Sequence, residues 1–210
     1  KKNICMVGLA SGIVLGNLGY THCGIEDMSI IRSIPGITIL SPADCAETAK
    51  CISAALLYEK PSYIRLTGGI NNPSVYKEDY NFEISKGVKL IEEGEIALIA
   101  TGTMVHKSLN VAEQLKKNNI NCSVTNIHTV SPIDENLIKE LNEKSKLIVT
   151  IEEHSIVGGL GTSVAEVNVK LKKPKPQLFI GLPKEYSKSG DYNFLIDYFG
   201  LSEDKINKKI

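Results

Sequence analysis

The sequence predicts an α/β fold made of two consecutive three-layer units, each with a mainly parallel sheet between helices. Two observations support this prediction. Apolar runs of strand length alternate with segments of helical periodicity, and this alternation requires right-handed crossovers between parallel strands. The chain also has 210 residues, which is enough for two domains that each bury a core.

The first half is expected to contain three strands, two helices and one long, glycine-rich loop. The second helix has a clear start, because Ser41 can accept a backbone hydrogen bond and Pro42 pre-sets φ. Asp44 and Glu47 favour the positive end of its dipole. In chain order, the expected elements are a strand at 3–9, the loop at 10–24, a helix at 25–33, a strand at 37–40, a helix at 43–58 and a strand at 62–66.

Both periodicities are lost between residues 68 and 80, where Gly, Asn, Pro and charged residues dominate. We therefore expect one domain at 1–68, a linker at 69–85 and a second domain at 86–210. Its expected elements are strands at 87–92 and 95–101, a helix at 104–118, a strand at 121–127, a helix at 135–142, a strand at 147–151, a helix at 159–171 and a strand at 177–182.

The composition argues against two classes of partner. Lys plus Arg and Asp plus Glu each total 24, so the formal net charge is zero and no basic field favours nucleic acid. The longest apolar run, at 96–100, is far shorter than the ~20 residues of a membrane-spanning helix. We therefore expect neither a nucleic-acid-binding protein nor a membrane protein.

The cysteines and the first residues indicate a compartment and a missing segment. The five cysteines form no Cys-x-x-Cys pair, and an odd number cannot all close into disulfides within one chain. A reducing, cytoplasmic setting fits this best. The sequence opens with Lys1-Lys2-Asn3 directly before an apolar run, without a methionine or a secretory leader, so we expect an upstream segment.

The loop at 10–24 is the first candidate for chemistry. It leaves the carboxyl end of a predicted parallel strand, where α/β sheets bind ligands. His22 can donate to or accept from a substrate oxygen near neutral pH, and Thr21 adds a neighbouring hydroxyl. The alternative is a loop histidine bonded to a nearby carbonyl, and periodicity by itself does not decide between the two.

Arg65 is the second candidate, at the carboxyl end of a predicted strand. Only Arg32 and Arg65 are arginines among the 24 basic residues, and the planar, forked donors of arginine suit phosphate or carboxylate. The alternative is an ion pair between Arg65 and a helix carboxylate. Arg32, at the end of a predicted helix, is interpreted as structural.

The third candidate is the segment 151–161, a strand that runs through a glycine turn into a helix whose N-terminus could hold an anion. It lacks both the G-x-G-x-x-G spacing and the Lys-Ser/Thr pair of a P-loop. Glu152, Glu153 and His154 point in alternate directions and no second ligand cluster is evident, so no metal site is predicted.

Five motifs follow one another along the chain: Gly19-Tyr20-Thr21-His22 with Ile25-Glu26-Asp27, Ser41-Pro42-Ala43-Asp44, Pro61-Ser62-Tyr63-Ile64-Arg65-Leu66, Ala100-Thr101-Gly102-Thr103-Met104-Val105, and Glu152-Glu153-His154-Ser155 with Gly158-Gly159-Leu160-Gly161. In this order and spacing they resemble the transketolase family over essentially the whole chain. The resemblance is to the C-terminal section found in the split branch of the family. Residues 1–68 would be the later part of a thiamine diphosphate pyrimidine-binding domain, and 86–210 a transketolase C-terminal domain.

The resemblance implies an enzyme of pentose phosphate metabolism that moves a two-carbon ketol unit between sugar phosphates. It would use thiamine diphosphate and a divalent metal ion, Mg²⁺ or Ca²⁺, with the cofactor between two protomers of a dimer. His22 matches the family's active-site histidine and is assigned catalysis and cofactor contact, while Thr21 and Arg65 are assigned substrate contact. The cofactor would supply the difficult chemistry, and the protein would orient and protonate.

Two positions depart from the family pattern. Leu18 stands where the family has an acid that recognises the hydroxyls of the donor sugar, and an isobutyl group cannot accept their hydrogen bonds. The family's phosphate-binding arginine falls on Gly68, three residues after Arg65. The resemblance therefore leaves the sugar open.

The family's cofactor-activating glutamate and its diphosphate-binding domain both precede the point where this sequence starts. We therefore expect the 210 residues alone to be inactive. The N-terminal section would come from the same chain or from a separate subunit. The C-terminal domain carries no catalytic residue of the family, so its expected role, including that of His154 and the glycine turn, is packing and dimer architecture.

Three alternatives remain open. 1-Deoxyxylulose-5-phosphate synthase shares the domain order and the Thr-His loop, but its last strand usually leads into Glu-Glu-Asn, whereas this chain has Glu152-Glu153-His154-Ser155. A 2-oxoacid dehydrogenase beta subunit is a more distant match. From another class, the chain could be a non-catalytic dimerisation module.

Overall fold

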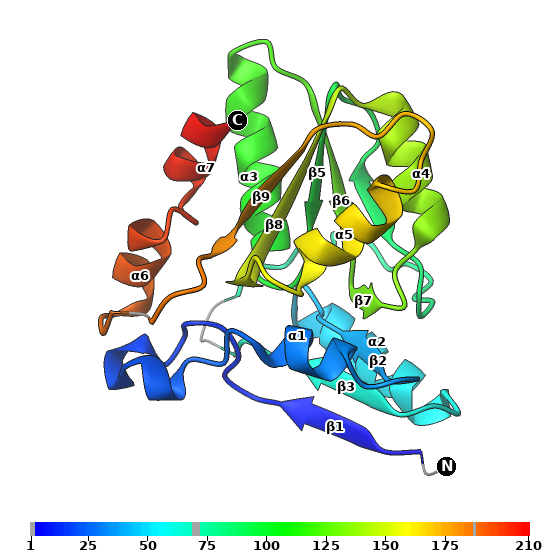
Figure 1. The fold of residues 1–210 in the computed structure, drawn as a ribbon, viewed down its shortest axis with the longest axis vertical. Helices are drawn as coiled ribbons and strands as arrows, with labels where there is room; N and C mark the ends of the chain where they lie inside the picture. The colour runs from blue at the N-terminus through cyan, green and yellow to red at the C-terminus, as the bar shows by residue number, and fades with distance from the viewer. Residues whose placement is uncertain (1–2, 69–71, 187) are drawn as a thin grey trace.

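The computed structural model describes residues 3–68, 72–186 and 188–210, and it contains two sheets, one above the other in Figure 1. The smaller sheet has the strand order β1-β3-β2-β7, with β3 parallel to both β1 and β2, and with β7 antiparallel to β2. Since β7 lies far along the sequence, the two halves of the chain share this sheet. The strands are β1 (Cys5–Gly8), β2 (Thr38–Leu40), β3 (Ser62–Arg65) and β7 (Thr129–Ser131).

The larger sheet has the order β4-β6-β5-β8-β9, in which only the β4–β6 pair is antiparallel. The strands β4 and β5 flank the turn at Glu93-Gly94 but do not pair with each other, because β6 lies between them. Both sheets are thus mainly parallel, as the sequence predicts. The strands are β4 (Val88–Ile91), β5 (Ile96–Ala100), β6 (Cys122–Asn126), β8 (Leu147–Ser155) and β9 (Gln177–Leu182).

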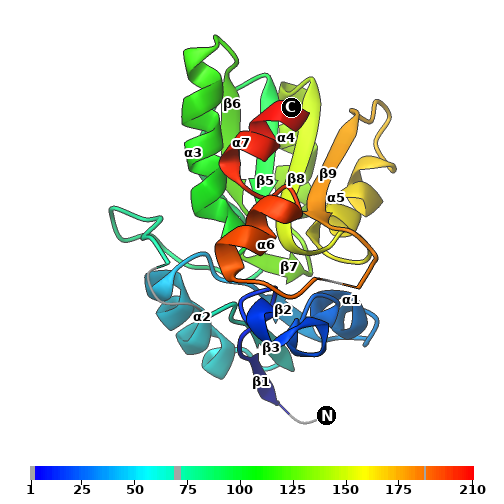
Figure 2. The ribbon, with the colours of Figure 1, turned by 90° about the vertical axis from the view of Figure 1, so that its left-hand side faces the viewer.

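Helices cover both faces of each sheet, which gives the expected three layers (Figures 1 and 2). On the larger sheet, α3 and α7 pack on one face, and α4 and α5 on the other. On the smaller sheet, α1 packs against Ile39 and Tyr63, whereas α2 packs against Leu40 and Ile64, because neighbouring strand residues point to opposite faces. The helices are α1 (Asp27–Arg32), α2 (Cys45–Leu57), α3 (Met104–Lys117), α4 (Glu135–Lys144), α5 (Leu160–Asn168), α6 (Tyr192–Tyr198) and α7 (Glu203–Lys209), with the 3-10 turns η1 (Gly16–Leu18) and η2 (Tyr20–His22).

The start of α2 corrects one expectation. The N-cap is Asp44, whose Oδ1 accepts a hydrogen bond from Glu47 N at 2.8 Å, and the helix begins at Cys45 rather than at residue 43. An N-cap side chain reaches the amide two or three residues further on, so Ser41 lies too early, and its hydroxyl is buried without a partner. Asp134 caps α4 in the same way, by accepting from Leu137 N at 3.1 Å.

Other elements differ from the expectation for reasons of length and burial. The strand β8 continues to Ser155, beyond the expected end at 151, because its polar residues are buried among partners of their own. The sequence does not predict the elements β7, α6 and α7. Each is too short for its periodicity to stand out in the sequence. Residues 69–71 of the expected linker lie outside the described residues.

Candidate functional site

The His22 loop, which we define as residues 10–24, leaves the carboxyl end of β1 and is more compact than expected. Its base is closed by hydrogen bonds from Gly12 N to Gly24 O (2.8 Å) and from Ser11 N to Leu66 O (3.1 Å). Between these two ends the chain forms η1 and η2. The loop is therefore a folded unit on the carboxyl edge of the smaller sheet.

His22 is the last residue of η2, and its side chain and that of Thr21 are exposed. Thr21 Oγ1 lies 3.1 Å from His22 Nδ1, within hydrogen-bond distance. The backbone turns through Gly19, which has a φ of +92° and accepts from His22 N at 3.0 Å. The loop therefore holds an imidazole and a hydroxyl side by side at the surface of the chain.

The tip of the His22 loop rests on the C-terminal segment and lies below α6 in Figure 1. The ring of Tyr20 meets that of Tyr186 edge-on, with 4.7 Å between centroids. Gly190 N donates to Gly16 O at 3.1 Å, where the loop packs against α6. Tyr20 also donates to Glu26 Oε1 at 2.5 Å, and this hydrogen bond to a carboxylate raises the pKa of Tyr20 to about 12.

Arg65 does not reach this surface, since its side chain is 2% exposed. Its Nε donates to Asp27 Oδ2 at 2.9 Å, and Asp27 is the first residue of α1. Its Nη2 donates to Gly24 O (3.2 Å) and to Glu153 O (3.0 Å). Of the two alternatives that the sequence left open, the structure thus shows the ion pair with a helix carboxylate.

The anion at the N-terminus of α5 is the chain's own Glu152. Its carboxylate accepts from Leu160 N at 2.7 Å and from Gly161 N at 2.8 Å, which explains the glycine turn without an external ligand. Burial raises the pKa of Glu152 to about 7, although both backbone amides lower it. Arg32, on α1, is structural as interpreted, because it pairs with Glu166 on α5 at 2.6 Å.

His154 is fully buried and bonded on both ring nitrogens, which agrees with a structural role. Met28 N lies 3.2 Å from Nε2 and can donate to it, so Nδ1 carries the proton and donates to Ser155 O at 2.8 Å. Burial, together with the Arg65 charge, lowers the pKa of His154 to about 4. The ring is therefore neutral near pH 7 and fastens α1 to the end of β8.

Glu153 is the residue that sequence reasoning missed. The sequence suggests it only as a metal ligand, yet its carboxylate accepts from Ile13 N (2.9 Å), Thr103 Oγ1 (2.7 Å) and the Tyr192 hydroxyl (2.7 Å). A carboxylate at the end of an apolar strand predicts a buried acceptor that needs donors. The sequence does not show which donors, because they come from segments up to 140 positions away.

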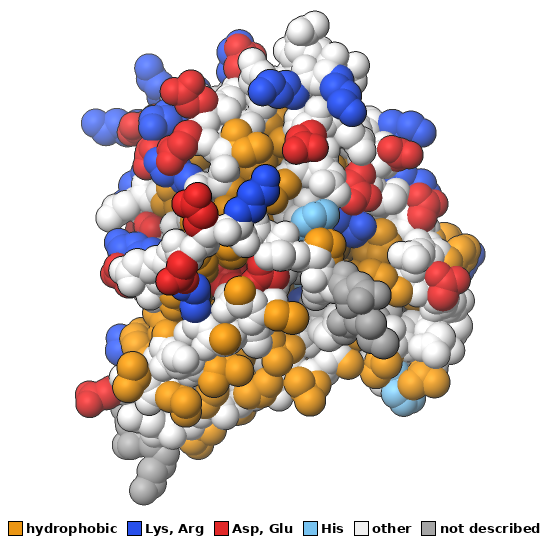
Figure 3. All heavy atoms as spheres, turned by 180° about the vertical axis from the view of Figure 1, so that it is seen from behind, with side chains coloured by type: hydrophobic (Ala, Val, Ile, Leu, Met, Phe, Trp, Pro, Cys, Tyr) orange, Lys and Arg blue, Asp and Glu red, His pale blue; other side chains and the backbone are white. Residues whose placement is uncertain are grey.

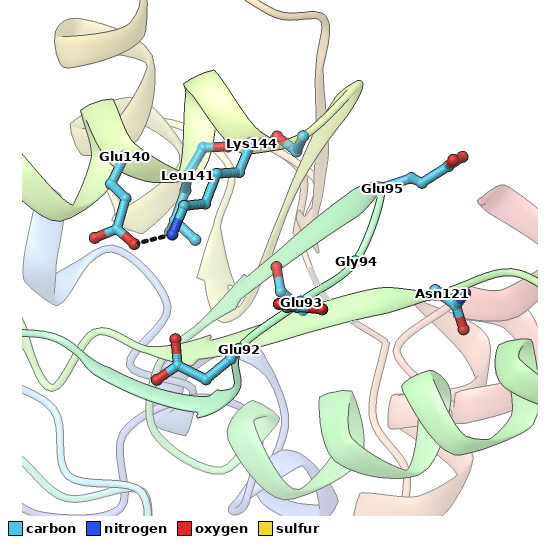
Figure 4. A pocket seen from close by; sticks show the side chains of 10 residues that line it. Glu92, Glu93, Gly94, Glu95, Asn121, Glu140, Leu141 and Lys144 are labelled. Atoms are coloured by element: carbon cyan, nitrogen blue, oxygen red, sulfur yellow. Dashed lines mark hydrogen bonds and ion pairs between the residues drawn. The ribbon is translucent and has the colours of Figure 1, made fainter.

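A separate hollow of about 640 Å³ lies at the amino ends of β5 and β6 (Figure 4). It is rich in glutamates, and several of them are paired with lysines, such as Glu140 with Lys144 at 2.7 Å and Glu95 with Lys146 at 3.0 Å. Thr103 and Glu153 lie at the carboxyl ends of the same sheet. The hollow therefore lies at the opposite end of these strands from Glu153, which contacts the His22 loop.

Two further features concern the described ranges 3–68, 72–186 and 188–210. They contain no group of three or more His, Cys, Asp or Glu side chains that could hold a metal ion. None of their helices is both long enough and apolar enough to span a bilayer.

The fold and the site define a class: α/β proteins with two interlocked, mainly parallel units and a Thr-His loop exposed at a strand's carboxyl end. Two family descriptions match the chain, "Transketolase, pyrimidine binding domain" over residues 1–70 and "Transketolase, C-terminal domain" over residues 85–206. The chain belongs to the transketolase family.

Similar proteins agree with this assignment. A Methanocaldococcus jannaschii protein named as a transketolase C-terminal section is 35% identical over 212 residues, which cover 100% of this chain and 66% of that protein. A 1-deoxy-D-xylulose-5-phosphate synthase from Caldanaerobacter subterraneus is 36% identical over 92% of this chain and 31% of its own length. The chain thus spans just under two thirds of the first relative and about a third of the second.

Solved structures give the same result. The structure described as "Split gene transketolase, inactive beta4 tetramer" has a TM-score of 0.86 at 31% identity, over 99% of this chain and 65% of that chain. Transketolase from Campylobacter jejuni shares the fold, with a TM-score of 0.79 at 20% identity over 98% of this chain and 30% of its own.

Proposed function

We propose that this chain is the C-terminal part of a transketolase-type transferase, which moves a two-carbon ketol unit between sugar phosphates with thiamine diphosphate. The observation that carries the proposal is the exposed pair of His22 and Thr21, held on a folded loop at the carboxyl end of a parallel strand. Family membership supplies the reaction class. The pentose phosphate pathway and a cytoplasmic location are parts of the same proposal.

The His22 loop fits one side of a composite cofactor site. The exposed imidazole of His22, the hydroxyl of Thr21 and the 56%-exposed side chain of Leu18 offer polar and apolar contacts to a flat heterocycle. Thiamine diphosphate, when bound, supplies the carbanion chemistry that cleaves and forms the carbon–carbon bond. His22 then orients a substrate oxygen and exchanges a proton with it, while the hydroxyl of Thr21 fixes the orientation of the His22 imidazole. We assign the diphosphate and its Mg²⁺ or Ca²⁺ to the N-terminal section.

The surface supports a partner section. The strand β1 pairs with β3 alone among the described strands. Its residues Met6 and Val7, and Ile4 just before it, are 36–55% exposed. Figure 3, which views the molecule from behind, shows hydrophobic side chains gathered over its lower part, where the smaller sheet lies, while charged side chains dominate above. A free strand edge with apolar side chains favours a covering protein. We propose that the N-terminal section, on the same chain or as a separate subunit, covers β1, and that the assembly is a dimer.

The test of this proposal is His22→Ala in the complete assembly, with thiamine diphosphate, Mg²⁺, a ketose phosphate and an aldose phosphate. We expect kcat to fall about 10²- to 10⁴-fold, which is typical for loss of a general acid–base group. Asn17→Ala is the control, since Asn17 is also exposed on the same loop. An unchanged rate in His22→Ala would remove this residue from the mechanism. Turnover by these 210 residues alone would contradict the need for another section.

A second candidate is 1-deoxy-D-xylulose-5-phosphate synthesis, which the 36% identity to the Caldanaerobacter enzyme favours. The donor distinguishes the two reactions. Ketol transfer consumes a ketose phosphate, whereas the synthase reaction consumes pyruvate and releases carbon dioxide. We expect product from the ketose phosphate. Turnover with pyruvate and the aldose phosphate, but not with the ketose phosphate as donor, would assign the second function. No turnover with either donor would indicate a dimerisation module.

A further inference from the structure

Glu153, on β8 of the larger sheet, contacts the base of the His22 loop. Its Oε1 accepts from Ile13 N at 2.9 Å, near the start of the loop. Its main-chain oxygen accepts from Arg65 Nη2, which also donates to Gly24 O at the end of the loop. Glu153 is therefore connected to both ends of the loop, directly at one and through Arg65 at the other.

The rest of the Glu153 carboxylate is held by the larger unit. Oε2 accepts from Thr103 Oγ1, just before α3, and from the Tyr192 hydroxyl on α6, each at 2.7 Å. Glu153 is 2% exposed, so water does not take the place of the carboxylate as acceptor for these donors when the carboxylate is removed. The carboxylate is thus a fixed point that joins the loop to β8, α3 and α6.

The loop is shaped to fit this carboxylate. Gly12 has a φ of +80°, and a Cβ on it would lie 2.2 Å from Glu153 Oε1. Ile13, which follows, is fully buried, so its side chain and its amide are both fixed. The loop backbone can therefore approach the Glu153 carboxylate this closely only because residue 12 is a glycine.

We propose that Glu153 is a positioning residue: through Ile13 N it fixes the base of the His22 loop and so sets the orientation of the His22 imidazole during ketol transfer. This inference rests on the proposed function. Catalysis depends steeply on orientation, and a displacement of about 1 Å can cost about 10²-fold in rate. Glu153 itself touches no reacting atom and acts through the loop.

The test compares Glu153→Leu, Glu153→Gln and Glu153→Asp in the complete assembly. Leucine removes the acceptor, so we expect kcat to fall about 10- to 100-fold while KM for the donor changes less than about threefold. Glutamine keeps an oxygen for Ile13 N, and the hydroxyls of Thr103 and Tyr192 can turn to accept from its amide, so we expect rescue to within about fivefold of wild type. Aspartate has a shorter side chain that withdraws the carboxylate from Ile13 N, so we expect the kcat of Glu153→Asp to lie between those of the leucine and glutamine variants. Glu153→Asp also provides the test if Glu153→Leu does not fold.

Glu152→Gln is the matched control, because this neighbouring buried carboxylate serves α5 and not the loop. We expect its kcat to stay within about twofold of wild type. In parallel, hydrogen exchange in the same chains should show the Gly12 and Ile13 amides exchanging at least about 10-fold faster in Glu153→Leu, with the amides of β5 unchanged.

Wild-type kcat together with wild-type exchange in Glu153→Leu or Glu153→Asp would overturn the inference. A loss in Glu153→Gln as large as in Glu153→Leu, or an equal loss in Glu152→Gln, would also overturn it, because the hydrogen bond to Ile13 would then not be the cause. If the wild-type assembly shows no ketol transfer, the proposed function fails, whereas the exchange at Ile13 still decides whether Glu153 anchors the loop.

Discussion

At the residue scale, two glycines with the same backbone angle differ in their surroundings. Gly12 and Gly36 both have a φ of +80°, but a Cβ on Gly12 would meet the Glu153 carboxylate, whereas one on Gly36 would meet nothing within 4 Å. Left-handed backbone costs an L-residue about 1–2 kcal/mol. Both glycines carry this backbone cost, so any additional loss of stability when Gly12 is replaced by alanine measures the close approach of the loop to Glu153.

We expect Gly36→Ala to lower the free energy of unfolding by about 1 kcal/mol, and Gly12→Ala by at least about 2 kcal/mol, because the carboxylate must also move. Urea denaturation of the two variants and of the wild type measures both effects. Equal losses at the two positions would show that the carboxylate moves aside freely.

Glu152 makes a pH-dependent contribution whose sign follows from its raised pKa. The folded value is about 7 and the ordinary value 4.5, so between these values the folded state holds a proton that the unfolded state has lost. Stability from this group is present below about pH 4.5 and falls as the pH rises through 7, by up to about 3 kcal/mol. The buried His128 and His154, with lowered pKa values of about 4, act in the opposite direction between pH 4 and 6.5.

We therefore expect the difference in unfolding free energy between wild type and Glu152→Gln to change with pH, with the variant gaining on the wild type from pH 4.5 to 7. Subtracting the two curves removes the contribution of the histidines, which both proteins share. Denaturant titrations of both proteins at half-unit pH steps measure this difference in unfolding free energy. A constant difference across this range would show that Glu152 titrates as an ordinary glutamate.

At the element scale, the cap of α2 also holds the segment after the first unit. Asp44 Oδ1 accepts from Glu47 N, while its Oδ2 accepts from Val75 N at 2.8 Å. Glu47 likewise accepts from the hydroxyl of Tyr76 at 2.8 Å and from the amide of Asn126 on β6. The first turn of α2 thus joins its helix, residues 75–76 and the larger sheet.

We expect Asp44→Ala to destabilise the protein by about 2–3 kcal/mol, since it removes an N-cap and leaves the buried Val75 amide unpaired. The control is Asp191→Ala, because Asp191 caps α6 by accepting from Phe194 N at 2.9 Å and lies at the surface. Its loss should cost only about 1 kcal/mol. Thermal unfolding checks the order, and a larger loss at Asp191 would contradict it.

At the scale of the whole molecule, the two units are expected to unfold together. Among the described residues, β7 completes the smaller sheet from within the second half of the chain, and Arg65, Glu47 and Glu153 make buried contacts between the units. Neither unit can therefore open without exposing polar groups that belong to the other.

Thiol labelling under increasing urea tests this cooperativity, because Cys51 is buried in the first unit and Cys122 in the second. Burial raises the pKa of both thiols, which lowers their reactivity while the protein is folded. We expect both to become reactive at one midpoint, with the exposed Cys5 and Cys45 labelled throughout. Separate midpoints would show that the units unfold independently.

The sequence by itself determined the α/β class, most of the strands and longer helices, and the Thr-His loop, because these depend on periodicity, glycine content and short motifs that local physics makes readable. Tertiary structure alone decided the role of Arg65, which pairs with Asp27 rather than facing outward, and the source of the anion at α5, which is Glu152. It also decided that β7 crosses into the smaller sheet and that Glu153 meets Ile13 across 140 positions. Such pairings depend on which buried donors and acceptors the packed chain brings together, and no local pattern encodes that choice.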